Sequence, residues 1–221
     1  MTTYLITGCG RGIGLAMTRA LLARGDRVFG SVRTGPAPIQ HEHFKLLTFD
    51  VCDEHAIRAA AASVQEPINV LVNNAGVIGP QTSKALEVGA ADFMEVLEVN
   101  VLGPLRVMQC FLSHLRQAKA AKIMTVSSQL GDMKYPGSDR IAYRSSKAAV
   151  NKLMQGIASD LARENIAVVI THPGWVRTDM GGTSADLEPE ESANGLIEVA
   201  DALTLETTGR FLNWDGTRRS W

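Results

Sequence analysis

Near its start the chain reads Tyr4-Leu5-Ile6-Thr7-Gly8-Cys9-Gly10-Arg11-Gly12-Ile13-Gly14. The first four residues predict a short buried strand, and residues 13–23 have helical spacing that ends at Arg24-Gly25. Glycines between a strand and a helix let the backbone approach a phosphate, and the helix offers free N–H groups and its positive dipole end. The order G-x-x-x-G-x-G differs from the common dinucleotide fingerprint G-x-G-x-x-G. The alternative interpretation is a tight strand-to-helix turn without a ligand.

The rest of the chain alternates short apolar runs with longer helical patterns. Further strands are predicted at 27–32, 46–49, 68–72, 123–127, 166–171 and 210–213, and helices at 54–65, 87–118, 139–164 and 188–205. This alternation predicts an α/β fold of the Rossmann type, a doubly wound parallel sheet between two layers of helices. We expect a bend near Gly103-Pro104, one domain over residues 1–221, and a flexible substrate flap around 178–190.

Composition and charge argue against several classes of partner. The formal net charge of −1 favours neither nucleic acid nor an anionic membrane. The longest apolar runs are too short to span a bilayer, and residues 1–10 lack the features of a signal peptide. The three cysteines, Cys9, Cys52 and Cys110, are scattered and have no zinc-like spacing. They indicate a reduced, cytoplasmic compartment and no metal site.

The residues that follow the predicted strands are a candidate ligand site. Ligands of doubly wound sheets bind beyond the carboxyl ends of the strands. The residues at those ends are Gly8, Arg33, Asp50, Asn73, Ser128 and Pro173. Because all of them follow the carboxyl ends of parallel strands, they are expected to lie at one edge of the sheet and to form a single site.

Tyr143 and Lys147 are four residues apart in a predicted helix and therefore share one face. An ammonium near a phenol favours the phenolate and would lower the phenol pKa from about 10. Such a phenol could donate its proton to a carbonyl oxygen near pH 7. A pair with this spacing is common and by itself favours a solvated helix face, and only the neighbouring motifs favour the catalytic interpretation.

Three further polar residues are considered for the same chemistry. Ser127 and Ser128 end a predicted strand, so at most one of them points into the site, where its hydroxyl could donate to a developing oxyanion. Ordinary turn chemistry at a strand end is the alternative. Asn100 lies within a predicted helix and needs partners, so it either holds a local bend or organises a water near Lys147.

The second predicted strand ends with Arg33, and no carboxylate stands there. NAD-specific sites of this fold usually place Asp or Glu at that point to accept the ribose hydroxyls. Arg33 could instead bind a 2′-phosphate with its planar guanidinium, and Arg11 in the glycine loop could supply a second cation. Each arginine alone could be a solvated surface charge. Together they predict NADPH rather than NADH.

Taken together, these motifs resemble the motif set of the short-chain dehydrogenases/reductases over nearly the whole chain. The matching motifs are Thr7-Gly8-x-x-x-Gly12-x-Gly14, Asp50-Val51, Asn73-Asn74-Ala75-Gly76, Asn100, Val126-Ser127-Ser128, Tyr143-x-x-x-Lys147 and Pro173-Gly174. The segments 172–182 and 209–217, together with Trp221, are similar to those of the C-factor/sniffer-like carbonyl reductases. Gly10 departs from the family, which usually carries Ser or Asn there to brace the turn.

The resemblance implies an oxidoreductase that transfers hydride between NADP(H) and a small carbonyl/alcohol pair. Tyr143 would be the acid/base, Lys147 would hold the nicotinamide ribose, Ser128 would bind the substrate oxygen, and Asn100 would complete a proton relay. The implied cofactor-binding residues are Gly8, Gly10, Arg11, Gly12, Ile13, Gly14, Arg33, Asp50, Val51, Asn74, Ala75, Gly76, Tyr143, Lys147, Pro173, Gly174, Val176 and Thr178.

The rival hypothesis is a non-catalytic protein that signals or senses a cofactor. A sensor needs a binding site but no proton donor, so the complete set of Asn100, Ser128, Tyr143 and Lys147 argues for the enzyme. For the assembly, the resemblance implies a homodimer rather than a tetramer.

Overall fold

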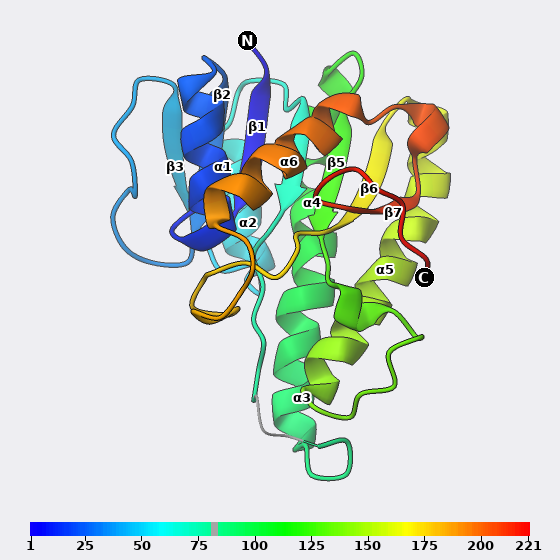
Figure 1. Ribbon diagram of the computed structural model, residues 1–221. Coiled ribbons are helices and arrows are strands. Elements are labelled where there is room, and N and C mark those ends of the chain that lie inside the picture. The colour runs from blue at the N-terminus through cyan, green and yellow to red at the C-terminus, as the bar shows by residue number, and fades with distance from the viewer. Residues whose placement is uncertain (81–83) are drawn as a thin grey trace.

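The computed structural model describes residues 1–80 and 84–221 and contains one parallel sheet (Figure 1). Its seven strands lie in the order β3-β2-β1-β4-β5-β6-β7. The chain runs outward from β1 in one direction and then returns to continue from β4 in the other, which makes the sheet doubly wound. The predicted fold class is confirmed.

The element bounds agree with most of the predicted ranges. The strands are β1 Thr3–Thr7, β2 Arg27–Val32, β3 Phe44–Thr48, β4 Val70–Asn73, β5 Lys122–Val126, β6 Ala167–His172 and β7 Arg210–Asn213. The α-helices are α1 Gly12–Ala23, α2 Glu54–Ala62, α3 Ala90–Leu97, α4 Gly103–Gln117, α5 Ile141–Leu161 and α6 Pro189–Ala202. No helix within residues 1–80 and 84–221 combines the length and the apolarity needed to cross a bilayer.

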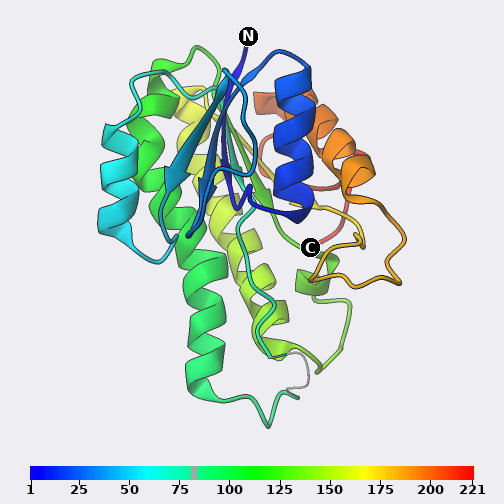
Figure 2. The ribbon, with the colours of Figure 1, turned by 90° about the vertical axis from the view of Figure 1, so that its left-hand side faces the viewer.

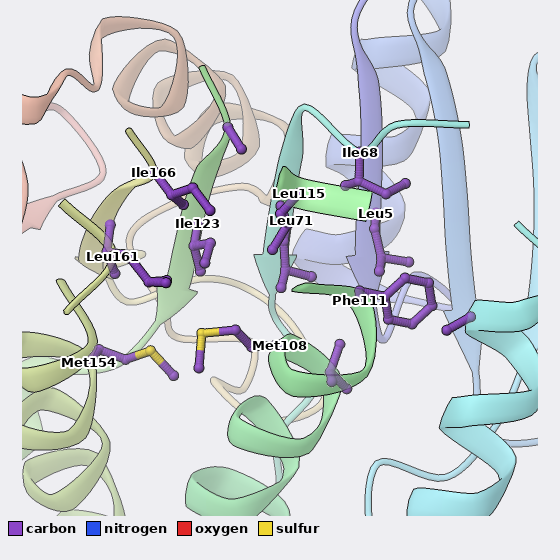
Figure 3. Close-up of a cluster of buried hydrophobic side chains, with 14 of the residues drawn as sticks. Leu5, Ile68, Leu71, Met108, Phe111, Leu115, Ile123, Met154, Leu161 and Ile166 are labelled. Atoms are coloured by element: carbon purple, nitrogen blue, oxygen red, sulfur yellow. The ribbon is translucent and has the colours of Figure 1, made fainter. Parts of the chain in front are cut away.

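Two hydrophobic cores lie on opposite faces of the sheet, because neighbouring strand residues point to opposite sides. Leu5 belongs to the core beneath α2, α4 and α5, whereas Ile6 belongs to the core beneath α1 and α6. Figure 2 shows these helices on the two sides of the sheet, and Figure 3 shows part of the first core. Burial on both faces explains why the strands are apolar almost throughout.

The predicted helix over 87–118 is not continuous. A π-helical segment, η1 Glu98–Leu102, separates α3 from α4. The expected irregularity thus lies directly before Gly103-Pro104. Pro104 sits in the first turn of α4 and has no N–H to donate to the preceding helical turn, which accords with the irregular hydrogen bonding there. Insertions of this kind often occur at functional sites, and this one contains Asn100.

Candidate active site

The glycine loop between β1 and α1 needs glycine at several of its positions. Gly8 and Gly12 have φ values of +70° and +54°, in the left-handed region that L side chains rarely adopt. At Gly14 a Cβ would lie 2.4 Å from the Gly8 carbonyl oxygen and 2.5 Å from Asn74 Nδ2. The loop therefore passes over the start of α1, whose first N–H groups have no helical partners.

Thr7 and Asn74 hold this loop against the end of β4. Asn74 Nδ2 donates to the carbonyl oxygens of Thr7 and Gly8 at 2.9 and 3.1 Å. Thr7 Oγ1 accepts the backbone N–H groups of Asn74 and Ala75, both at 3.0 Å. Sequence reasoning assigned Asn74 to the cofactor and did not find this brace, which joins residues far apart in the chain.

We expect Gly14→Ala to destroy cofactor binding, because the new methyl group would displace both the Gly8 carbonyl and the Asn74 amide. Overpacking of this kind typically costs about 1–3 kcal/mol of stability. Gly156→Ala is the matched control: Gly156 lies in α5 with no neighbour within 4 Å of an added Cβ. Thermal unfolding and cofactor titration of both variants check this, and normal binding by Gly14→Ala would contradict it.

The structure brings Tyr143 and Lys147 together on the buried face of α5, with 8% and 6% of their surfaces exposed. Lys147 Nζ lies 5.4 Å from the centre of the Tyr143 ring and donates to the Val126 carbonyl at 3.0 Å. A Cβ on Gly76 would lie 3.7 Å from the same Nζ. The ammonium thus lies between the ends of β4 and β5, beside the Tyr143 ring.

The pKa of Tyr143 differs from the sequence-based expectation. Burial raises it, while a hydrogen bond with Ser128 and the charge of Arg140 act in the opposite direction. Burial also lowers the pKa of Lys147 to about 8. The expected lowering of the Tyr143 pKa by Lys147 is therefore wrong for this structure. The ammonium lies over the ring, and desolvation of the phenolate is the largest effect.

Ser127 and Ser128 point in different directions, as expected for adjacent strand residues. Ser127 Oγ donates to Asn151 Oδ1 at 2.5 Å and so lies beneath α5. Ser128 Oγ accepts the Leu130 N–H at 3.1 Å and interacts with the Tyr143 side chain. Ser128 is therefore the hydroxyl beside the phenol.

Asn100 joins the loop after β4 to α5. Its Oδ1 accepts the Val77 N–H at 2.9 Å, and its Nδ2 donates to the Val77 carbonyl at 2.8 Å and to Ser146 Oγ at 3.0 Å. Ser146 Oγ in turn donates to the Tyr143 carbonyl at 2.7 Å. Asn100 thus holds the π-helical segment in register with the helix that carries the phenol. Its role in a proton relay stays a prediction.

The residues expected at the adenosine half of the cofactor gather near the ends of β1, β2 and β3. Arg33 is exposed and makes no hydrogen bond or ion pair with any described residue. A Cβ at Gly10 would lie 3.3 Å from Val32 Cγ1. Asp50 Oδ1 accepts the Cys52 N–H at 2.9 Å, and Val51 is buried against Gly103. These positions are compatible with the predicted roles.

The segment after β6 returns to the glycine loop. Pro173 accepts a hydrogen bond of 2.6 Å from Ser192, and Gly174 has a φ of +85°. Val176 is buried and forms an isolated bridge with Leu187. Thr178 Cγ2 would lie 3.1 Å from a Cβ on Gly12. The start of the predicted flap therefore lies against the glycine loop, whereas its flexibility stays a prediction.

Comparison with known proteins identifies the same family that the sequence motifs resemble. The family model for short chain dehydrogenases matches residues 2–188. The C-signal protein of Myxococcus xanthus is 40% identical over 167 residues, which are 75% of this chain and 100% of that protein. The NADPH-bound carbonyl reductase from chicken fatty liver superimposes with a TM-score of 0.93 at 32% identity, covering 100% of this chain and 99% of that one.

The carbonyl reductase Sniffer of Drosophila melanogaster also has a TM-score of 0.93, with 29% identity and 100% coverage of both chains. Both structural neighbours share the fold over their whole length, and the family model covers most of the chain. The predicted resemblance is confirmed: this chain belongs to the short-chain dehydrogenase/reductase family of oxidoreductases.

Proposed function

We propose that the protein reduces a ketone or aldehyde to an alcohol with NADPH, or catalyses the reverse reaction. The observation that carries this proposal is the buried Tyr143–Lys147 pair with Ser128 beside the phenol. A proton donor and a hydroxyl at the carboxyl edge of the sheet, next to a glycine loop, suit transfer to a carbonyl oxygen.

The residues present fit a dinucleotide with a 2′-phosphate. Gly8 and Gly12, with positive φ values, hold the loop at the start of α1, whose first N–H groups have no helical partners and could bind a pyrophosphate. Arg33 offers an exposed cation without a protein partner among the described residues. The NADPH bound to the chicken reductase supports the same cofactor here. When bound, the nicotinamide would supply the hydride.

The side chains of the protein would supply the proton that the carbonyl oxygen takes up. Ser128 would donate a hydrogen bond to the carbonyl oxygen, and Tyr143 would transfer its phenolic proton to that oxygen as negative charge develops. Burial keeps the phenol protonated, which suits a general acid in the direction of reduction. Lys147 would hold the ribose with its ammonium group. Asn100 would help to return a proton to the phenol through water.

We expect Arg33→Ala to lower the preference for NADPH over NADH by about tenfold or more. A charge-assisted hydrogen bond contributes about 1.5–3 kcal/mol, and only NADPH carries the phosphate that would accept it. The matched control is Arg19→Ala, which removes an exposed arginine from α1. Catalytic efficiencies with both cofactors check this, and a ratio unchanged by Arg33→Ala would remove Arg33 from the phosphate site.

The second candidate function is signalling or cofactor sensing without turnover, and the similarity to the C-signal protein favours it. Stoichiometric NADPH binding without reduction of any member of a broad carbonyl panel would support this alternative. NADPH oxidation dependent on a carbonyl would support the enzyme. The substrate, the homodimer and the cytoplasmic location stay predictions.

A further inference from the structure

Asp179 forms an ion pair with Arg11, and this contact joins the segment after β6 to the glycine loop. The two residues are 168 positions apart in sequence. Both side chains are largely exposed, at 79% for Arg11 and 76% for Asp179. The adjacent contact of Thr178 with Gly12 brings the two backbones together at the same point.

The segment from Trp175 to Glu188, here called the β6–α6 loop, holds Asp179 in a defined position. At its base, the Arg177 N–H donates to the Leu187 carbonyl at 2.8 Å, and the Leu187 N–H donates to the Trp175 carbonyl at 3.0 Å. The turn that carries Asp179 is closed by the Gly182 N–H, which donates to the Thr178 carbonyl at 2.8 Å. These backbone hydrogen bonds fix the base of the loop and the turn that carries Asp179, and so hold its carboxylate close to Arg11.

Arg11 is also one of the two cations expected to bind the 2′-phosphate of NADPH. A phosphate monoester carries about −1.5 to −2 charges near pH 7, so it would repel the Asp179 carboxylate and compete with it for the guanidinium. Exposed ion pairs are weak, and a more highly charged anion can displace one partner. NADH, which lacks this phosphate, does not enter the competition.

We propose that Asp179 is a specificity-determining residue that restrains the preference for NADPH by competing with the 2′-phosphate for Arg11. This inference rests on the proposed function. When the phosphate binds, Arg11 exchanges its carboxylate partner for the phosphate. The β6–α6 loop then loses its ionic contact with the glycine loop, so cofactor binding and the position of this loop are linked.

The test is a fluorescence titration of NADPH and of NADH with Asp179→Asn, which removes the charge and keeps the shape. The matched control is Asp186→Asn: Asp186 is exposed on the same loop and makes no ion pair within the described part of the chain. Arg11→Ala and the Arg11→Ala/Asp179→Asn double variant complete a double-mutant cycle, which measures how far the effect of Asp179 on NADPH affinity depends on Arg11.

We expect Asp179→Asn to bind NADPH about two- to fivefold more tightly, the range that an exposed ion pair supports. Its NADH affinity and both affinities of Asp186→Asn should be unchanged, and the gain should vanish without Arg11. An equal gain for both cofactors, an equal gain in Asp186→Asn, a gain that persists in Arg11→Ala, or no gain at all would overturn the role of Asp179.

The two proposals can fail separately. If the unaltered protein binds NADPH and reduces carbonyls but Asp179→Asn behaves like Asp186→Asn, only the role of Asp179 is wrong. If the unaltered protein binds no NADPH, both proposals are wrong.

Discussion

Replacing Tyr143 by Phe is expected to lower the turnover of carbonyl reduction by about 10²–10⁴-fold, the usual contribution of a general acid. The substitution removes only the phenolic oxygen, and the buried ring remains packed on α5. Cofactor binding should therefore persist, because Lys147 and the glycine loop are unaltered. Steady-state kinetics and an NADPH titration on the same preparation separate the two effects.

Tyr4→Phe is the matched control for this variant. Tyr4 lies near the amino end of β1, whereas the proposed site lies at the carboxyl ends of the strands. Its hydroxyl accepts a hydrogen bond from Arg24 Nη2 at 2.8 Å and donates to Asp201 Oδ1 at 3.2 Å. The same oxygen is deleted, but far from the proposed site. Tyr4→Phe should keep its turnover. Near-native turnover by Tyr143→Phe would show that Tyr143 is not the acid.

Replacing Lys147 by Met is expected to weaken NADPH binding about tenfold or more, with a matching loss of turnover. Met keeps most of the buried stem and removes the ammonium, whose charge-assisted hydrogen bonds to the ribose would contribute about 1.5–3 kcal/mol. Burial lowers the pKa of Lys147 to about 8, so the charge is present at pH 7 and is largely lost at pH 9. The affinity of the unaltered protein should therefore fall as the pH rises through 8.

The Lys147→Met variant should bind weakly at both pH values, because it has no group that titrates there. Lys152→Met provides the control: Lys152 is exposed on the same helix, where it donates to Gln155. Titrations at pH 7 and pH 9 for the three proteins measure the difference. Unchanged affinity and an unchanged pH dependence in Lys147→Met would exclude Lys147 from the cofactor site.

Much of this fold could be predicted from local patterns. Strand and helix periodicity depends on neighbouring residues, so the alternation of elements and the doubly wound sheet followed from the sequence. The glycine spacing located the loop before α1, and the separation of Tyr143 from Lys147 placed both on one helix face. The fold class and the family needed no tertiary contact to be recognised.

Other features depended on contacts that no local pattern contains. The π-helical break contains Asn100, whose side chain hydrogen-bonds to the Val77 backbone in the loop after β4. The brace from Asn74 to the glycine loop joins the ends of two strands.

The direction of the Tyr143 pKa and the partner of Arg11 were likewise decided by the tertiary structure. The spacing of Tyr143 and Lys147 placed the charge near the phenol, but burial, which depends on packing from several elements, proved the larger effect. The Arg11–Asp179 pair arises because β1 and β6 both end at the same edge of the sheet. Periodicity is a property of neighbours in the chain, whereas desolvation and ion pairing depend on which distant segments the folded sheet brings together.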